Sequence, residues 1–247
     1  QYESVKYIQS CGTHQTSLSV LVRTLMDTRY FHGIRTIAAD AIAVIAKNSL
    51  QEVGQYQLEK AFSEMFCVEN THMPRPNDWT NRIHYILQCS LPQSMAKLRD
   101  GEGKVPLSVR RFFIDKLKFN DNTTNEYNDA HYISILMTCL ADSLVVSHRE
   151  PQASYTFEFG EDGAMGDDAN PDADFEKEAI NEIERYRRID EWISTYHNVY
   201  STTAIVCLQK LTQSGIVKDK VRELLEYTRV ENAVNVRLVA FNCLVET

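Results

Sequence analysis

Histidine, cysteine and paired carboxylates are the residues in this chain that could hold a metal ion or act as nucleophiles. The 247 residues include seven histidines and six cysteines. No histidines form the H-E-x-x-H pattern of zinc hydrolases, and no C-x-x-C pair is present. No G-x-G-x-x-G, P-loop or G-x-S-x-G run offers a phosphate cradle or a nucleophile elbow. The sequence therefore predicts a binding protein rather than an enzyme, with no catalytic residue, metal site, cofactor or small-molecule substrate.

The cysteines lie mostly among apolar residues, which favours reduced, buried thiols over a disulfide framework. Such usage is typical of a reducing compartment, the cytosol or the nucleus. No apolar run approaches the ~20 residues of a membrane span, so we expect no membrane partner. The six cysteines are Cys11, Cys67, Cys89, Cys139, Cys207 and Cys243.

Basic residues gather between positions 97 and 118, where seven cations and three acids give a local charge of +4. Such a patch can contact DNA phosphates without reading sequence. The alternative, which we favour, is a solvated helix face whose charges form internal ion pairs. The candidate residues for contact with DNA or a partner are Lys104, Arg110, Arg111, Lys116 and Lys118.

Acidic residues are concentrated in one tract, residues 158–178. It holds nine acids and one base, a balance that equals the net charge of −8 of the whole chain. We expect residues 150–172 to form a flexible acidic insertion. It either solubilises the chain, which we favour, or serves as a protein-binding segment or a mimic of nucleic acid.

Helical periodicity dominates the elements that must position these residues. Pro92 should kink its helix or split it after Ser90, and Pro106 fits the first position of a helix. The only credible strand is Ser154–Phe159. Phe119 and Trp192 are assigned, with other aromatics, to the core rather than to a stacking platform. The predicted helices are 2–10, 13–27, 34–46, 55–67, 79–100, 106–119, 128–148, 173–195, 199–213, 217–228 and 233–246.

A faint repeat relates the two ends of the chain. Gly33-Ile34-Arg35 and Asn235-Val236-Arg237 are each followed by small or apolar residues at the same offsets. This pattern is typical of the second helix of HEAT-type repeats, in which antiparallel helix pairs stack around a continuous core. We predict an all-α, right-handed HEAT/armadillo-like solenoid of about ten to twelve helices. Residues 1–247 should form one domain, cut from a longer polypeptide because no initiator Met is present and helical pattern runs to the last residues.

The most distinctive stretch of the chain is residues 91–143. It contains Leu91–Asp100, Phe113–Asn122, Tyr127–Tyr132 and Leu140–Ser143, and resembles the C-terminal helical region of the family of subunit two of the transcription factor TFIID, in a fungal version. The resemblance runs from Tyr2 to about Glu246 and leaves out only the acidic tract.

The resemblance implies an aminopeptidase-like architecture without catalysis, ending in a stack of HEAT-like helix pairs. It also implies a nuclear scaffold that supports core-promoter recognition and assembly of the RNA polymerase II preinitiation complex. The implied partners are other TFIID subunits, notably the histone-fold subunit eight and the largest subunit, and core-promoter DNA.

Two alternatives remain open at this point. The chain could be the C-terminal capping domain of an active zinc aminopeptidase, which an upstream H-E-x-x-H and G-A-M-E-N would reveal. It could also be a cytosolic helical-repeat adaptor, which would not co-purify with TFIID subunits.

Overall fold

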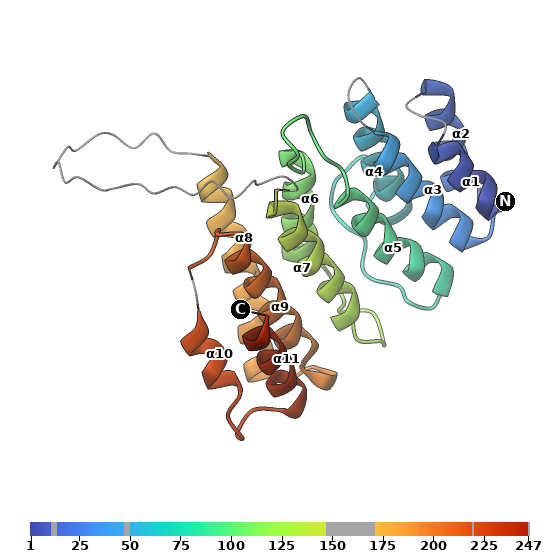
Figure 1. Cartoon of the computed structure of the whole chain (residues 1–247). Helices are drawn as coiled ribbons and strands as arrows, with labels where there is room; N and C mark the ends of the chain where they lie inside the picture. The colour runs from blue at the N-terminus through green and yellow to red at the C-terminus, as the bar shows by residue number, and fades with distance from the viewer. Residues whose placement is uncertain (11–13, 47–49, 147–170, 219, 247) are drawn as a thin grey trace, which may run out of the picture.

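A computed structural model describes residues 1–10, 14–46, 50–146, 171–218 and 220–246 (Figure 1). These residues form eleven α-helices and one short 3-10 helix, and include no strand beyond a single bridge between Cys67 and Pro74. The helices are α1 (Tyr2–Ser10), α2 (Gln15–Met26), α3 (His32–Ile45), α4 (Gln51–Phe66), α5 (Arg82–Met95), α6 (Leu107–Lys118), α7 (Ala130–Leu144), α8 (Pro171–Trp192), η2 (Tyr196–Asn198), α9 (Val199–Gln213), α10 (Val221–Tyr227) and α11 (Val234–Val245).

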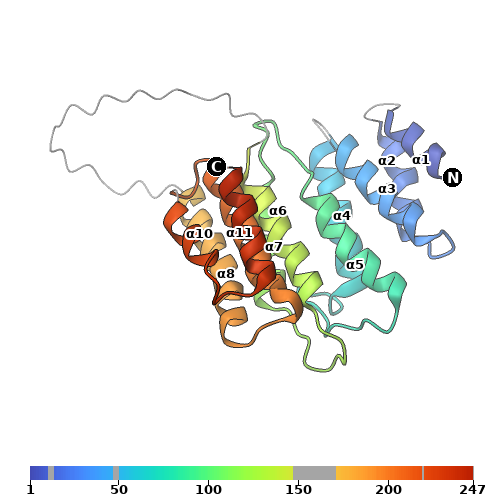
Figure 2. The ribbon, with the colours of Figure 1, turned by 60° about the horizontal axis from the view of Figure 1, so that its bottom comes forward.

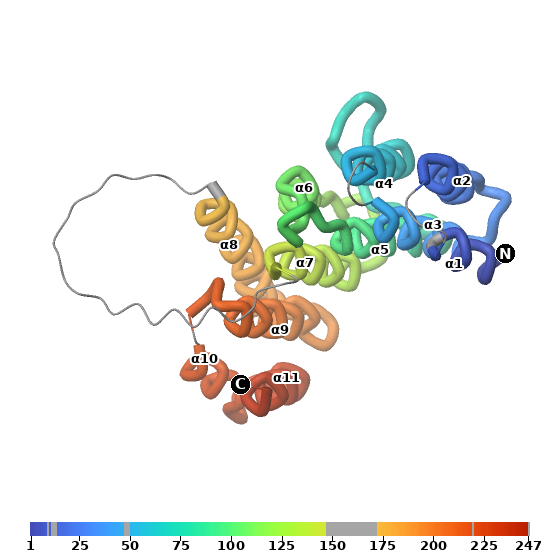
Figure 3. Tube along the Cα trace, turned by 45° about the horizontal axis from the view of Figure 1, so that its top comes forward, coloured from blue at the N-terminus to red at the C-terminus, as the bar shows by residue number. Residues whose placement is uncertain are grey.

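The helices form two rows. Each odd-numbered helix packs against the next one, from α1 to α11, and the even-numbered helices lie along the outer side of this row. Seen along the helices, the stack bends, and the odd-numbered row lines the inside of the bend (Figure 3). A second view shows the same succession of layers (Figure 2). The predicted all-α solenoid is confirmed.

Small residues allow the layers to approach closely. The buried face of α3 carries Ala38, Ala41 and Ile42, all fully shielded from solvent. At Gly54 of α4, a Cβ atom would stand 2.3 Å from the Cβ atom of Ala46. Real Cβ atoms do not approach this closely, so Gly54 lets the start of α4 cross the end of α3.

The repeated arginine caps a neighbouring helix. Arg35 is 4% exposed, and its Nε donates to the carbonyl oxygen of Leu25 near the end of α2, at 2.7 Å. One of the last carbonyls of α2 thereby gains a hydrogen-bond donor. Its counterpart Arg237 has a buried Nε atom with no hydrogen-bond partner among the described residues.

Two proline predictions require correction. α5 runs unbroken through Pro92, which is buried in its last turn. A proline there removes only one backbone bond, and packing of α5 against α3 and α7 keeps the helix whole. Pro106 is the residue before α6 rather than its first residue. The predicted strand Ser154–Phe159 lies outside the described residues.

The apolar core has two parts. One cluster of buried side chains runs from Val5 in α1 to Leu211 in α9. A second, small cluster consists of Ile205, Leu224, Val236 and Cys243, and joins α9 to α10 and α11. The assignment of residues 1–247 to one domain, with an insertion at 150–172, stays a prediction. Among the described helices, none is both long and apolar enough to cross a membrane.

Candidate functional site

The five basic candidates lie on α6 or just before it, but they do not form one open surface. Arg111 and Lys118 are exposed and Lys104 is half-buried. Arg110 is 8% exposed and Lys116 is 2% exposed. The helical spacing explains this difference, because Lys116 follows Val109 by seven residues and therefore shares its buried face. That spacing was the signal in the sequence that separates Lys116 from the exposed cations.

The start of α8 neutralises three of these cations. Asp172 accepts a hydrogen bond from Arg110 Nη2 at 3.0 Å and lies 3.4 Å from Lys104 Nζ. Burial tends to raise the pKa of Asp172, but the charges and hydrogen bonds of Arg110 and Lys104 outweigh it and lower the pKa. Glu178 forms an ion pair with Lys118. Internal ion pairs are thus present, and contact of this cluster with DNA stays a prediction.

Lys116 occupies an interior position of a different kind. Its Nζ donates to the carbonyl oxygen of His72 and lies 3.4 Å from Cys67 Sγ. The rings of Phe112 and Phe62 have their centroids 5.1 Å and 5.6 Å from the same nitrogen. Within the described residues, no carboxylate forms an ion pair with Lys116. Aromatic faces and a carbonyl dipole therefore stabilise this buried cation.

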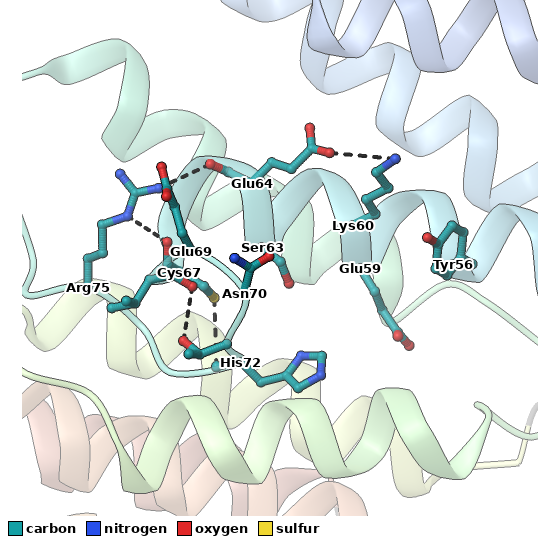
Figure 4. Close-up of a pocket in the computed structure, with 12 residues that line it drawn as sticks. Tyr56, Glu59, Lys60, Ser63, Glu64, Cys67, Glu69, Asn70, His72 and Arg75 are labelled. Carbon is teal, nitrogen blue, oxygen red and sulfur yellow. Dashed lines mark hydrogen bonds and ion pairs between the residues drawn. The ribbon is translucent and has the colours of Figure 1, made fainter.

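A cavity of about 520 Å³ opens beside this group, between α4 and residues 67–75 (Figure 4). Arg75 fixes its edge by donating to the carbonyl oxygens of Cys67 at 2.6 Å and Glu64 at 3.1 Å. The cavity lining contains acidic and basic side chains. The acids are Glu59, Glu64 and Glu69, and the bases are Lys60 and Arg75. The described part of the chain contains no group of three or more metal-ligating side chains, here or elsewhere.

A second cavity, of about 500 Å³, lies on the inner row between α5, α7 and α9. Ion pairs tie neighbouring inner helices together around it. Asp40 of α3 accepts from Ser94 Oγ at 2.6 Å and from Lys97 Nζ at 2.8 Å. Lys210 of α9 pairs with Asp142 of α7 at 2.5 Å. These contacts bridge α3 to the end of α5 and α7 to α9 on the inner row.

The cysteines of the described residues are buried. Burial raises the pKa of Cys89 to about 11 and that of Cys207 to about 12, and it also raises the pKa of Cys139. These thiols stay protonated at neutral pH and are poor nucleophiles.

The corner between α8 and α9 was missed by sequence reasoning. Asp190 is 1% exposed and accepts hydrogen bonds from Thr195 N at 2.6 Å and Ser201 N at 3.0 Å. His197 and Asn198 have φ values of 60° and 53°, a left-handed conformation that this carboxylate clamp helps to hold.

This corner presents apolar side chains to solvent. Trp192 is 90% exposed, and Ile193 and Tyr196 are each 78% exposed. The prediction that Trp192 and Phe119 belong to the core is wrong, since Phe119 is 49% exposed. Trp192 follows the buried Tyr186 by six residues, which places it toward the opposite face of α8.

The chain matches the family described as "TAF2-like, TPR repeats" over residues 1–247. It is 34% identical over its full length to transcription initiation factor TFIID subunit 2 of Schizosaccharomyces pombe, and spans 20% of that protein. It is 27% identical over 80% of its length to the Saccharomyces cerevisiae subunit, spanning 12% of it, and 25% identical over its full length to that of Gallus gallus, spanning 20%. The chain therefore belongs to the TAF2-like family of helical-repeat proteins.

Proposed function

We propose that this chain is a docking scaffold within a subunit of TFIID and carries out no catalysis itself. The match to the TAF2-like family along the whole chain is the observation that carries this proposal. The relatives are named as subunits of a transcription initiation factor. The proposal places the protein in the nucleus, at assembly of the RNA polymerase II preinitiation complex. Because the chain spans only 20% of its S. pombe relative, the activity and partners of the whole protein are part of the proposal.

The proposed mechanism is geometric. Buried apolar side chains pack successive inner helices against one another, so the stack presents a preshaped surface. Docking on a preshaped surface avoids part of the entropy cost of association. The proposed partners are other TFIID subunits, including the histone-fold subunit eight and the largest subunit.

Affinity purification of the tagged full-length protein from its own cells tests this function. We expect TFIID subunits to co-purify, and fluorescence imaging to show the protein in the nucleus. A cytosolic protein that co-purifies with no TFIID subunit would support the adaptor alternative instead. The aminopeptidase alternative requires hydrolysis of aminoacyl anilides by the full-length protein, and we expect none above background.

The exposed corner at Trp192 is a proposed docking contact, and mutation of Trp192 tests it. Trp192→Asp should reduce recovery of partner subunits several-fold, because solvent-exposed aromatic side chains that become buried dominate interface energies. Tyr7, which is 70% exposed on α1 at the other end of the stack, provides the control Tyr7→Asp. Equal recovery with both variants would place docking elsewhere.

Core-promoter DNA is a second proposed partner, favoured by Arg111. This residue is exposed and makes no ion pair within the described residues. Arg111→Glu in the intact complex should weaken promoter binding and flatten its dependence on salt concentration. Arg110→Glu is unsuitable for this test because Arg110 pairs with Asp172. Unchanged affinity and salt dependence for Arg111→Glu would remove Arg111 from the DNA proposal.

A further inference from the structure

One lysine and one cysteine meet inside the protein although they lie 49 residues apart in the sequence. Cys67 follows the last residue of α4, and Lys116 lies in the last turn of α6. Their side-chain atoms, Sγ and Nζ, are 3.4 Å apart. Cys67 is 1% exposed and Lys116 is 2% exposed, so both side chains are held by their surroundings.

The surroundings favour chemistry between the two groups. The carbonyl oxygen of His72 accepts hydrogen bonds from both Cys67 Sγ, at 3.7 Å, and Lys116 Nζ. The remaining neighbours of the ammonium include the apolar rings of Phe62 and Phe112. No carboxylate among the described residues forms an ion pair with Lys116, and its nitrogen also donates to Cys67 Sγ. The nucleophilic nitrogen and the sulfur are therefore held in contact.

Cys67 differs from the other described cysteines in having a lysine nitrogen beside its sulfur. Cys67 and His72 line the cavity of about 520 Å³ in Figure 4, which is open to solvent and admits a small oxidant. Cys139 lines the second cavity, and burial raises the pKa of its thiol as it does that of Cys207. Cys67 therefore combines a position on an open cavity with a lysine nitrogen 3.4 Å from its sulfur.

We propose that Cys67 and Lys116 form a site of oxidative cross-linking by hydrogen peroxide. Peroxide transfers one oxygen to Cys67 Sγ, giving a sulfenic acid and water. Lys116 Nζ then gives one proton to solvent in the cavity and attacks Sγ, so that an S–N bond forms and the S–O bond breaks. The departing hydroxide takes a proton from the nitrogen and leaves as a second water. Overall, the sulfur loses two electrons and one peroxide is reduced to two waters.

The link would join the end of α4 to α6 and fix residues 67–75 between them. Arg75 already ties this segment to α4 through the carbonyl oxygen of Cys67. A thiol reductant would restore the free groups, because a thiolate can attack the sulfur of the S–N bond.

The test uses the full-length protein, treated with limiting hydrogen peroxide and digested without reductant. Mass spectrometry should find a linked pair of peptides containing Cys67 and Lys116, lighter by two hydrogens than their sum. Dithiothreitol should abolish it. Cys67→Ser should also abolish the link, while the matched control Cys139→Ser should retain it.

Two results would overturn the proposal, and both come from the unmutated protein. Cys67 could gain one or more oxygens while the Lys116 peptide stays free, or it could stay unmodified while Cys139 and Cys207 react. Lys116→Gln adds a readout, because loss of the amine should leave Cys67 to accumulate as sulfinic acid. If Lys116→Gln fails to fold, the linked peptide from the unmutated chain still decides.

Discussion

At the scale of single residues, the pairing of Arg110 with Asp172 makes a stability prediction. Asp172→Asn should destabilise the fold by about 1–3 kcal/mol, because the buried guanidinium loses its charged acceptor. The lowered pKa of Asp172 means that its ionised form binds best in the folded state. Its contribution is therefore fully present above the unfolded pKa, near 3.8, and is lost as pH falls through the lower folded value. Urea unfolding at several pH values measures both effects.

The control for this variant is Asp174→Asn. Asp174 lies two residues further along α8, and its one ion pair among the described residues is with the exposed Lys177. Exposed pairs contribute little, so we expect a change below about 0.5 kcal/mol. If both asparagine variants unfold at the same urea concentration, the pairing with Arg110 contributes nothing measurable.

Gly54 makes a prediction about packing. Gly54→Ala should destabilise the protein by about 1–3 kcal/mol, since the new methyl group collides with Ala46 and forces the helices apart. Gly101 provides the matched comparison, because a Cβ there meets nothing within 4 Å. Thermal unfolding of the two alanine variants should separate them by several degrees. A Gly54→Ala protein as stable as Gly101→Ala would mean that α3 and α4 are less closely packed.

The helix face that a residue occupies could be predicted from the sequence far better than the residues it contacts. The periodicity of α6 places Lys116 on the same helix face as Val109. No feature of the neighbouring sequence reveals that the nitrogen of Lys116 contacts Cys67. The acidic tract and the basic cluster are both visible in the sequence, but their contact depends on how α8 lies across α6. Trp192 was misplaced because aromatic character was given more weight than its helical position.

At the scale of elements, an ionic network attaches α10 to α8. Glu184 of α8 pairs with Lys220 at 2.9 Å and with Arg187, which also contacts Glu223 of α10 at 3.7 Å. Burial acts to raise the pKa of Glu184, but Lys220 and Arg187 lower it overall. The network is half-buried, so salt should weaken it only in part.

Removing the charge of Glu184 tests this attachment. Glu184→Gln should increase amide hydrogen exchange in α10 and α11, with a loss of about 1–2 kcal/mol in local protection. Because the folded pKa of Glu184 lies below its usual 4.5, lowering the pH through the folded value should loosen the same helices in the unmutated protein. Glu191→Gln is the control, since Glu191 is 47% exposed and, within the part of the chain that the structure describes, pairs with Arg187 alone. Unchanged exchange in α10 for Glu184→Gln would contradict this role.

The elements themselves were largely predictable, because amphipathic spacing sets each helix before any long-range contact forms. The unbroken α5 was not, since the penalty at Pro92 is local while the compensating contacts come from α3 and α7. The repeat marks Arg35 in the sequence, but only the structure shows that its acceptor is the carbonyl oxygen of Leu25. The stacking of helix pairs followed from that repeat.

At the scale of the whole molecule, a solenoid is held together by contacts between neighbouring layers, so its stability is distributed along one dimension. The main apolar cluster spans α1 to α9, whereas α10 and α11 are attached mainly through the smaller cluster and the ionic network. The layer of α10 and α11 should consequently open before the layers of α3, α5 and α7. This difference in stability between the layers follows from the division of the apolar core into two clusters. Sequence periodicity does not reveal that division.

Two core substitutions separate these parts. Val236→Ala in the small cluster should lower protection from hydrogen exchange by about 1–2 kcal/mol in α10 and α11 and leave α3, α5 and α7 unchanged. Leu136→Ala in the main cluster should instead cost about 2–5 kcal/mol and reduce protection across the central helices, because Leu136 is fully buried in α7. Exchange that increases equally in every helix for both variants would show that the described helices unfold as one cooperative unit. In that case the division of the core would have no energetic counterpart, and the inner surface would remain intact or be lost as a whole.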